Sequence, residues 1–279
     1  MAATTEMIWQ EGQADKADYQ RRVYSRGMYS NNWWRKLRWF FRYDCQYRLL
    51  LMEELFRRHA IPFEHQKVFE LGFGTGDLLF RFDSTSTLHG CEVTAEAVEA
   101  IETDDRLMRY TAAHFTCSEE DGVPIFPGHD YDIVLASHVL EHVPDDAAML
   151  RELMRHVRPG GHGLFFLPLE RPGHLPKLHA RTYTAAGFSR LVEDNGWKIV
   201  EVSENFRYAS HLVQIVNWPS RHKIPVVGKL VEAVKNVALG LPPTTFIRLV
   251  EEPLERLHVS PRQLMVLAQR PAKKKPKQD

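Results

Sequence analysis

Three glycines spaced two residues apart follow a short apolar run that contains a glutamate. These residues are Glu70, Gly72, Gly74 and Gly76. Glycine allows the backbone to turn tightly and leaves its N–H groups open to a ligand, which a side chain would keep away. Glu92 ends a second apolar run, where a carboxylate can accept hydrogen bonds from both hydroxyls of a ribose. The spacing therefore predicts a nucleoside-binding site, and the alternative is a tight turn with no ligand.

The same turn argues against a dinucleotide ligand. A dinucleotide fingerprint would place its third glycine at position 77, where this chain has Asp77. That fingerprint also has no need of an acid at Glu70. The expected ligand is therefore a nucleoside compound of another kind.

Histidines follow two of the apolar runs. His138 lies directly after residues 131–136, and His174 and His179 lie in the loop after residues 163–167. Open α/β folds bind ligands at the carboxyl ends of their strands, and a histidine there can remove a proton from a hydroxyl or enol group. His138 is our first candidate for such a base. The structural alternatives are a ring bonded to a nearby carbonyl for His138 and surface polarity for His174 and His179.

The elements that would position these residues alternate in type from Lys67 onward. Short apolar runs alternate with helical patterns, which predicts βα units, a mainly parallel sheet and an α/β fold. Strands are expected at residues 68–71, 88–93, 131–136, 163–167, 197–202 and 263–268. A helix is expected directly after the glycine turn, and Asp145 is suited to cap the helix that follows the histidine at 138.

Over roughly residues 67–202 the chain resembles the class I S-adenosylmethionine-dependent methyltransferases. Their first motif is an acid-x-Gly-x-Gly-x-Gly run, found here at residues 70–76. Residues 131–143 resemble the fourth strand and following turn of that family, and residues 158–161 match its frequent Arg-Pro-Gly-Gly pattern. The resemblance implies a doubly wound, mainly parallel sheet of seven strands, a Rossmann-like fold. It also implies S-adenosylmethionine as cofactor and S-adenosylhomocysteine as product.

The resemblance also assigns roles to individual residues. The glycine turn would meet the methionine part of the cofactor, Glu70 would orient its ammonium group and Glu92 would hold the ribose. Ser118 and Glu119 fall where the adenine is usually contacted. The cofactor-binding residues implied in this way are Glu70, Gly72, Gly74, Gly76, Glu92, Ser118, Glu119 and Ser137. His142, in the frequent Leu-Glu-His pattern, is expected to be structural.

We predict four parts along the chain. Residues 1–60 form an aromatic and basic helical segment, either a lid over the cofactor or core packing. Residues 61–204 and 262–271 form the methyltransferase core, residues 205–261 a helical insertion before the last strand, and residues 272–279 a disordered basic tail.

The chemistry favours an O-methyltransferase that acts on a small molecule such as a secondary metabolite, a sugar or a lipid-linked acceptor. The histidines in both acceptor-side loops, the aromatic segment and the insertion would build an enclosed pocket. The fourth strand lacks an Asn/Asp-Pro-Pro-Tyr turn, which argues against N-methylation of amides and bases. One alternative is an RNA or protein methyltransferase that docks through its Arg- and Trp-rich N-terminus, and another is a non-catalytic partner with the same fold.

Composition narrows the remaining classes. Equal numbers of acidic and basic residues, 36 each, provide no global field for binding nucleic acid. The three cysteines show neither disulfide nor metal-ligand spacing, and no histidine spacing demands a metal. No signal peptide or membrane span is visible, so we expect a cytoplasmic protein. The apolar stripe at residues 224–247 suits core packing, a second subunit or peripheral membrane attachment.

Overall fold

The computed structural model describes residues 43–118, 123–170, 173–176, 178–207 and 251–272. These residues belong to two compact units. The first holds residues 63–203 and 265–272, and the second holds residues 43–62, 204–207 and 251–264. Most of the predicted N-terminal segment, most of the predicted insertion and nearly all of the basic tail lie outside the described residues.

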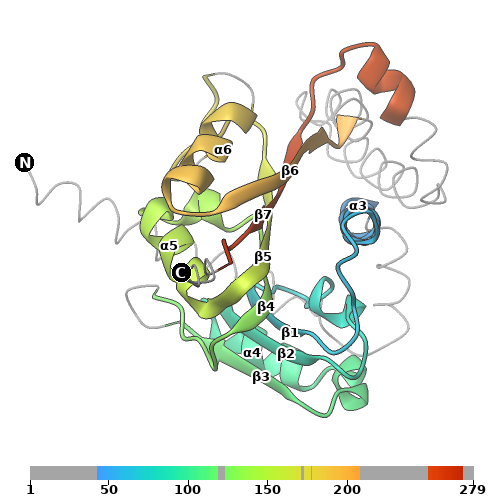
Figure 1. The fold of residues 1–279 in the computed structure, drawn as a ribbon, viewed down its shortest axis with the longest axis vertical. Helices are drawn as coiled ribbons and strands as arrows, with labels where there is room; N and C mark the ends of the chain where they lie inside the picture. Colours follow the sequence, from blue (N-terminus) through green and yellow to red (C-terminus); the bar gives the residue numbers. More distant parts are fainter. Residues whose placement is uncertain (1–42, 119–122, 171–172, 177, 208–250, 273–279) are drawn as a thin grey trace, which may run out of the picture. The chain divides into compact units, whose positions relative to one another are not determined.

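Seven strands form one sheet in the order β3-β2-β1-β4-β5-β7-β6 (Figure 1). They are β1 Lys67–Leu71, β2 Thr87–Glu92, β3 Ala113–Cys117, β4 Tyr131–Ser137, β5 Val157–Pro168, β6 Lys198–Asn205 and β7 Gln263–Gln269. The pairs β1–β2, β1–β4, β2–β3 and β4–β5 are parallel. The amide of Gly160 donates to the carbonyl of Arg270, and the amide of Arg270 donates to that of Gly161, so β7 runs antiparallel to β5. The predicted doubly wound, mainly parallel fold is confirmed.

The β3 strand has no counterpart among the runs read from the sequence. It lies at the edge of the sheet, and only Phe115 of its five residues is buried. An edge strand with a polar, exposed pattern carries little apolar signal, which explains why the pattern did not indicate it.

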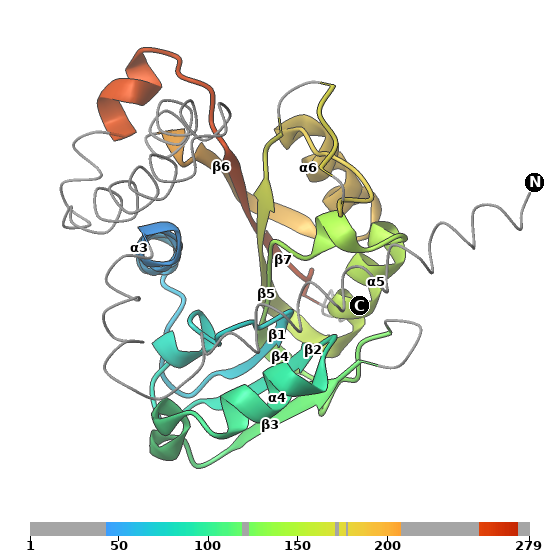
Figure 2. The same ribbon diagram turned by 180° about the vertical axis from the view of Figure 1, so that it is seen from behind.

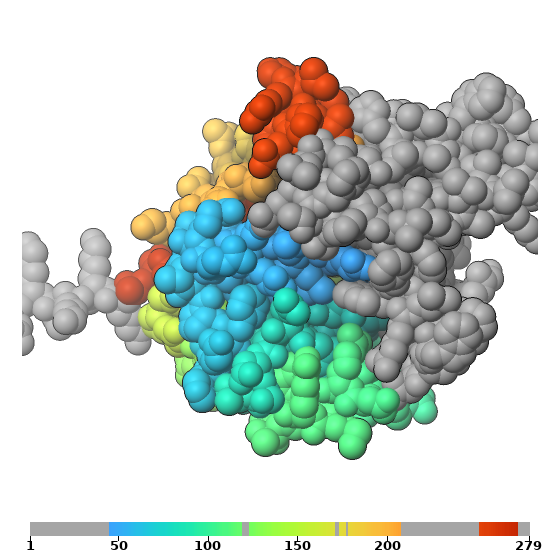
Figure 3. All heavy atoms as spheres, turned by 90° about the vertical axis from the view of Figure 1, so that its right-hand side faces the viewer, coloured from blue at the N-terminus to red at the C-terminus, as the bar shows by residue number. Residues whose placement is uncertain are grey.

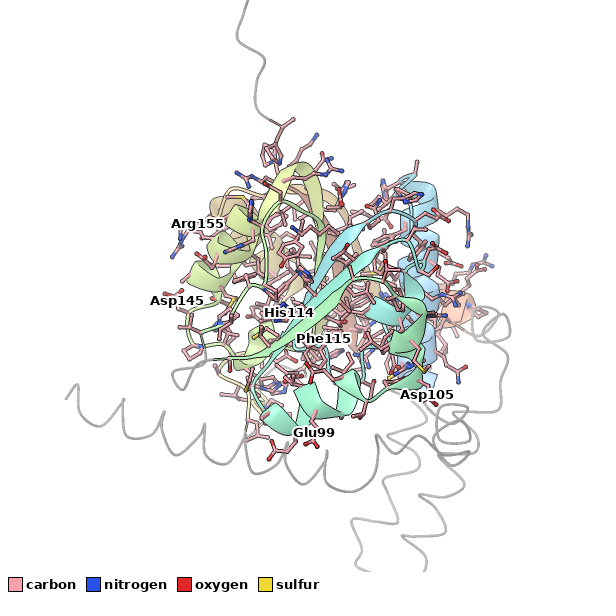
Figure 4. The ribbon with its side chains drawn as sticks, turned by 90° about the horizontal axis from the view of Figure 1, so that it is seen from below. Glu99, Asp105, His114, Phe115, Asp145 and Arg155 are labelled. Carbon is pink, nitrogen blue, oxygen red and sulfur yellow. The ribbon has the colours of Figure 1, made fainter. Side chains whose placement is uncertain are left out.

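Helices of the first unit are placed by their caps and apolar faces. They are α4 Ala95–Glu102, α5 Asp146–His156 and α6 Ala185–Asp194, with short 3-10 helices η2 Leu79–Arg81, η3 Asp105–Arg109 and η4 Leu140–His142. The helices α5 and α6 lie side by side (Figures 1 and 2). The predicted cap of α5 is confirmed, because Asp145 Oδ1 accepts from the amide of Ala148 at 2.8 Å. Figure 4 shows Asp145 and Arg155 near opposite ends of this helix.

The helix expected after the glycine turn is only the single 3-10 turn η2. The chain must reach the start of β2 at Thr87 within a few residues of η2. The chain reverses direction in a turn at Asp83. The Asp83 carboxylate accepts from the amide of Thr85, and the Asp83 carbonyl accepts from the amide of Ser86. The prediction of a full helix at this position was wrong.

The second unit includes α3, Tyr43–Arg58, which is drawn in blue in Figure 3. The ring of Tyr47 on this helix packs against Phe206 with 5.8 Å between centroids. Arg207 joins the end of the β6 segment to a later part of the same unit, because its amide donates to Glu251 and its Nε to the carbonyl of Val259. Within the described part of the chain, no helix is both long and apolar enough to cross a bilayer.

A half-buried histidine in the sheet predicts how stability depends on pH. His89 Nδ1 lies 2.9 Å from the hydroxyl of Tyr131. Burial, followed by the positive charges of Lys67 and His114, lowers the pKa of His89 from 6.5 to about 4. Between pH 6.5 and pH 4 this histidine is protonated in the unfolded chain but not in the folded chain. The stability of the folded state relative to the unfolded state therefore falls as the pH drops from 6.5 toward 4.

We expect this histidine to account for a loss of about 1–2 kcal/mol in the free energy of unfolding, after allowance for solvent screening of a half-buried ring. Urea denaturation at several pH values should show a smaller acid loss for His89→Gln than for the native chain. His129→Gln is the control, because that side chain is 79% exposed. Parallel pH profiles for the native chain and His89→Gln would contradict the assignment.

Candidate functional site

The carboxyl ends of three parallel strands meet at one edge of the sheet. Leu71 at the end of β1 pairs with Cys91 of β2 on one side and with Ala136 of β4 on the other. The residues that follow these three positions therefore lie together. They are the glycine turn, Glu92 and Ser137.

Glu92 is held with its carboxylate facing the glycine turn. It is 5% exposed, and its two oxygens accept from the amides of Gly74 at 3.1 Å and Val93 at 2.9 Å. The amide of Ser118 donates to the backbone carbonyl of Glu92 at 2.7 Å, so Ser118 lies beside this acid, and its contact with the adenine stays a prediction. Glu119 lies outside the described residues, and Glu70 is buried within β1 at 2% exposure.

The three glycines of the turn serve different physical needs. All three have positive φ angles of 67°, 52° and 67° at Gly72, Gly74 and Gly76. A Cβ at Gly72 would lie 2.3 Å from Val139 Cγ2, and one at Gly76 would lie 2.7 Å from Ile101 Cδ1. A Cβ at Gly74 would meet no atom within 4 Å. The backbone at Gly74 therefore borders open space, which suits the close approach of a cofactor to the turn.

This difference predicts different effects of the same substitution. Gly72→Ala should destabilise the fold by about 2–4 kcal/mol, because the methyl group must displace Val139 as well as adopt a left-handed conformation. Gly74→Ala should cost only about 1 kcal/mol of stability and should mainly weaken cofactor binding. Urea denaturation and calorimetry with S-adenosylhomocysteine measure the two quantities. Equal affinity of Gly74→Ala and the native chain would remove Gly74 from the cofactor site.

Arg106 braces the far side of this turn and was not recognised in the sequence. Its guanidinium donates to the carbonyl of Thr75 at 2.7 Å and to Asp77 at 2.8 Å, and it pairs with Asp104 at 2.9 Å. Asp77 thus serves as an anchor for the turn at the position where a dinucleotide site would have its third glycine. Nothing in the spacing pointed to Arg106, because it contacts the turn from about 30 residues further along the chain.

His138 flanks the glycine turn from the neighbouring strand. It follows β4 with a φ of 57°, a conformation that is uncommon outside glycine. Its amide donates to the carbonyl of Phe166 at 2.9 Å, and its side chain is 34% exposed. Nδ1 of the ring lies 3.6 Å from Oε1 of Glu141, which is too long for a hydrogen bond but close enough for charge attraction.

Of the other two candidate histidines, His179 lies close to Glu141 and His174 does not. His179 lies near Glu141 and His142, with ring centroids of the two histidines 4.9 Å apart. Burial lowers the pKa of His179, and the neighbouring His142 lowers it further. His174 is exposed and makes no contact with the group among the described residues. The structure thus brings His138 and His179 together and adds Glu141 and His142.

Residues 69–162 match the family model of a methyltransferase domain. The chain is 26% identical over 155 residues to the ubiquinone/menaquinone biosynthesis C-methyltransferase UbiE of Vibrio parahaemolyticus, a match that covers 54% of this chain and 58% of the relative. It is 26% identical over 185 residues to UbiE of Pseudomonas savastanoi pv. phaseolicola, covering 62% of this chain and 70% of that one. The chain thus spans less than two thirds of the Vibrio relative's length.

Among solved structures, the cyclase SpnF is similar with a TM-score of 0.54 and 17% identity, covering 80% of this chain and 82% of that one. A likeness at this identity concerns the fold alone. The matched residues include the glycine turn, Glu92 and strand β4, which His138 follows. Residues 69–162 therefore form a methyltransferase domain of the class I S-adenosylmethionine-dependent type, whose cofactor is S-adenosylmethionine.

Proposed function

We propose that this chain transfers a methyl group from S-adenosylmethionine to a hydroxyl or enol oxygen of a small molecule. The observation that carries the proposal is the position of His138. A Cβ at Gly72 would strike Val139, so the residue next to His138 touches the cofactor turn itself. A proton acceptor and the methyl donor would then share one edge of the sheet.

S-adenosylmethionine supplies an electrophilic methyl group on a sulfonium. The turn at residues 72–76 and Glu92 would hold this cofactor, which leaves acceptor activation to the loops after β4 and β5. His138 would take the acceptor's proton, and the buried carboxylate of Glu141 at 3.6 Å would stabilise the charged ring that forms. His179, on the neighbouring loop, is the second candidate for this role.

Methylation at carbon is the second candidate function. The named relatives are C-methyltransferases of ubiquinone and menaquinone biosynthesis. Removal of a proton from a phenol or enol makes both the oxygen and the adjacent ring or α-carbon nucleophilic, so the same base would serve either outcome. Orientation of the acceptor toward the methyl group then decides between oxygen and carbon.

Two other functions remain as alternatives. A macromolecular substrate would dock on the aromatic and basic segment, most of which lies outside the described residues. A non-catalytic partner, or an enzyme of different chemistry, is compatible with this fold because the similar structure of SpnF is that of a cyclase. The open space at Gly74 and the orientation of Glu92 support cofactor binding in this chain.

The test is methyl transfer by the purified full chain with a deuterated methyl donor. A panel of phenols, enols, quinols and hydroxylated sugars would be offered, with bulk RNA and a peptide mixture as macromolecular acceptors. We expect a labelled small molecule, and NMR of the product distinguishes an O-methyl from a C-methyl group. Label only in RNA or peptide would replace the proposal. Absence of label from every acceptor, with cofactor binding intact, would favour the non-catalytic alternative.

A further inference from the structure

A buried carboxylate and imidazole rings converge from two loops beside His138. Glu141 and His142 belong to η4, after β4, and His179 comes from the segment between β5 and α6. One potential ligand atom from each of these three residues lies within 4.8 Å of the other two. Two imidazoles and one carboxylate are a donor set that binds divalent transition metals.

One oxygen of the Glu141 carboxylate lacks the hydrogen-bond partner that a buried polar atom requires. Its side chain is 2% exposed, and Oε2 is fully buried with no hydrogen-bond partner among the described residues. Its only ion-pair contacts in the described part of the chain are with His138 and His142, at 3.6 and 3.9 Å. A buried carboxylate with no close cation or donor is costly, and a bound cation removes that cost.

His142 is oriented as a metal-binding histidine would be. Its Nδ1 lies 2.8 Å from the carbonyl of Leu178, and because a carbonyl can only accept, Nδ1 carries the proton. The lone pair of the neutral ring is then on Nε2, which faces Oε1 of Glu141. A histidine that donates one nitrogen to a backbone carbonyl and presents the other is the usual arrangement around a metal.

His179 also presents a nitrogen without a partner. Its Nδ1 is buried and accepts or donates no hydrogen bond among the described residues, with Oε1 of Glu170 4.0 Å away.

The two loops are held together independently of any ligand. The amide of Ala180 donates to the carbonyl of Glu141 at 2.7 Å. Arg181 donates to the carbonyl of Val143 at 2.8 Å and to that of Pro144, and it pairs with Asp146 at 2.8 Å. These bonds fix the backbone that carries all three side chains, so rotation of the side chains alone would complete a site.

We propose that Glu141, His142 and His179 form a binding site for one divalent transition metal ion of the zinc class. Ligand atoms around tetrahedral zinc are about 3.4 Å apart, so the observed atoms would draw in by up to roughly 1.4 Å. Three protein ligands would leave a fourth coordination position to water or another ligand. Magnesium is disfavoured, because it prefers oxygen ligands.

Metal binding at this site does not require methyl transfer, so it is measured without a methyl donor. The untagged full chain, stripped with a chelator, would be titrated with ZnCl2 by calorimetry and with Co²⁺ by visible absorption. We expect one ion per chain with micromolar or tighter affinity, and d–d absorption bands of Co²⁺ typical of low coordination number. MgCl2 at the same concentrations should produce no binding heat.

Substitutions of single residues test which side chains bind the metal. Glu141→Gln and His179→Gln should each weaken Zn²⁺ binding by about 100-fold or more. His174→Gln, an exposed histidine in the same connection, is the matched control and should bind as the native chain does. Zinc should raise the melting temperature of the native chain. Glu141→Gln should still melt in a cooperative transition, which shows that it folds, and zinc should not shift its melting temperature. Absence of binding to the folded native chain, or equal binding by the native chain and Glu141→Gln, would overturn the proposal.

Discussion

Replacement of Glu92 by alanine is expected to lower the affinity for S-adenosylhomocysteine by about 100-fold. The carboxylate is buried and fixed by the amides of Gly74 and Val93. It would accept from two ribose hydroxyls, and hydrogen bonds to a charged group contribute about 1.5–3 kcal/mol each. Calorimetry with the demethylated product measures binding without the complication of turnover.

The control for Glu92→Ala is Glu99→Ala. Glu99 is an exposed acid on α4 and is labelled in Figure 4. The Glu99→Ala substitution removes the same charge from the same part of the sequence. It should leave the affinity for S-adenosylhomocysteine unchanged within about twofold. Unaltered affinity of Glu92→Ala would contradict the role of this acid. Tight binding of a nicotinamide dinucleotide, with no heat from S-adenosylhomocysteine, would contradict the cofactor site as a whole.

His138→Asn is expected to lower turnover by about 100-fold or more while cofactor affinity changes by less than about threefold. Asparagine tolerates the left-handed backbone found at this position, with φ at 57°, but it cannot accept the acceptor's proton. A loss of turnover would therefore report the chemistry of the ring and not strain in the chain. Single-turnover rates with the acceptor found in the labelling experiment measure the effect.

His129→Asn is the matched control for His138. His129 lies just before the amino end of β4, at the opposite end of the strand, and its side chain is 79% exposed. Its substitution should leave turnover within about twofold of the native value. If His138→Asn also retains native turnover, His138 is not the base, and His179→Asn becomes the next variant to measure.

Local sequence was sufficient to predict most of the core. Strand β1 and its glycine turn are encoded within ten residues, and the buried run at residues 131–136 forms β4 as expected. Turns and buried strands depend on interactions between near neighbours, which periodicity and glycine placement report directly. The same signals failed where they were weak, at the exposed edge strand β3 and at the shortened helix η2.

Part of the site could not be predicted from local sequence patterns. Arg106 reaches the cofactor turn from a distant 3-10 helix, and the frequent Leu-Glu-His pattern indicated a structural role for His142 without indicating the burial of Glu141. Ordinary polar residues in a turn do not report whether the fold will bury them.

The sequence by itself determined that the glycine turn and Glu92 would stand one strand apart, because the carboxyl ends of neighbouring parallel strands lie on the same edge of the sheet. Only the tertiary structure decided which histidines meet. His142 and Leu178 are 36 positions apart, and their contact depends on how the loops after β4 and β5 pack. Such packing is the summed result of strand register, buried side chains and hydrogen bonds across the whole sheet, which no local pattern records.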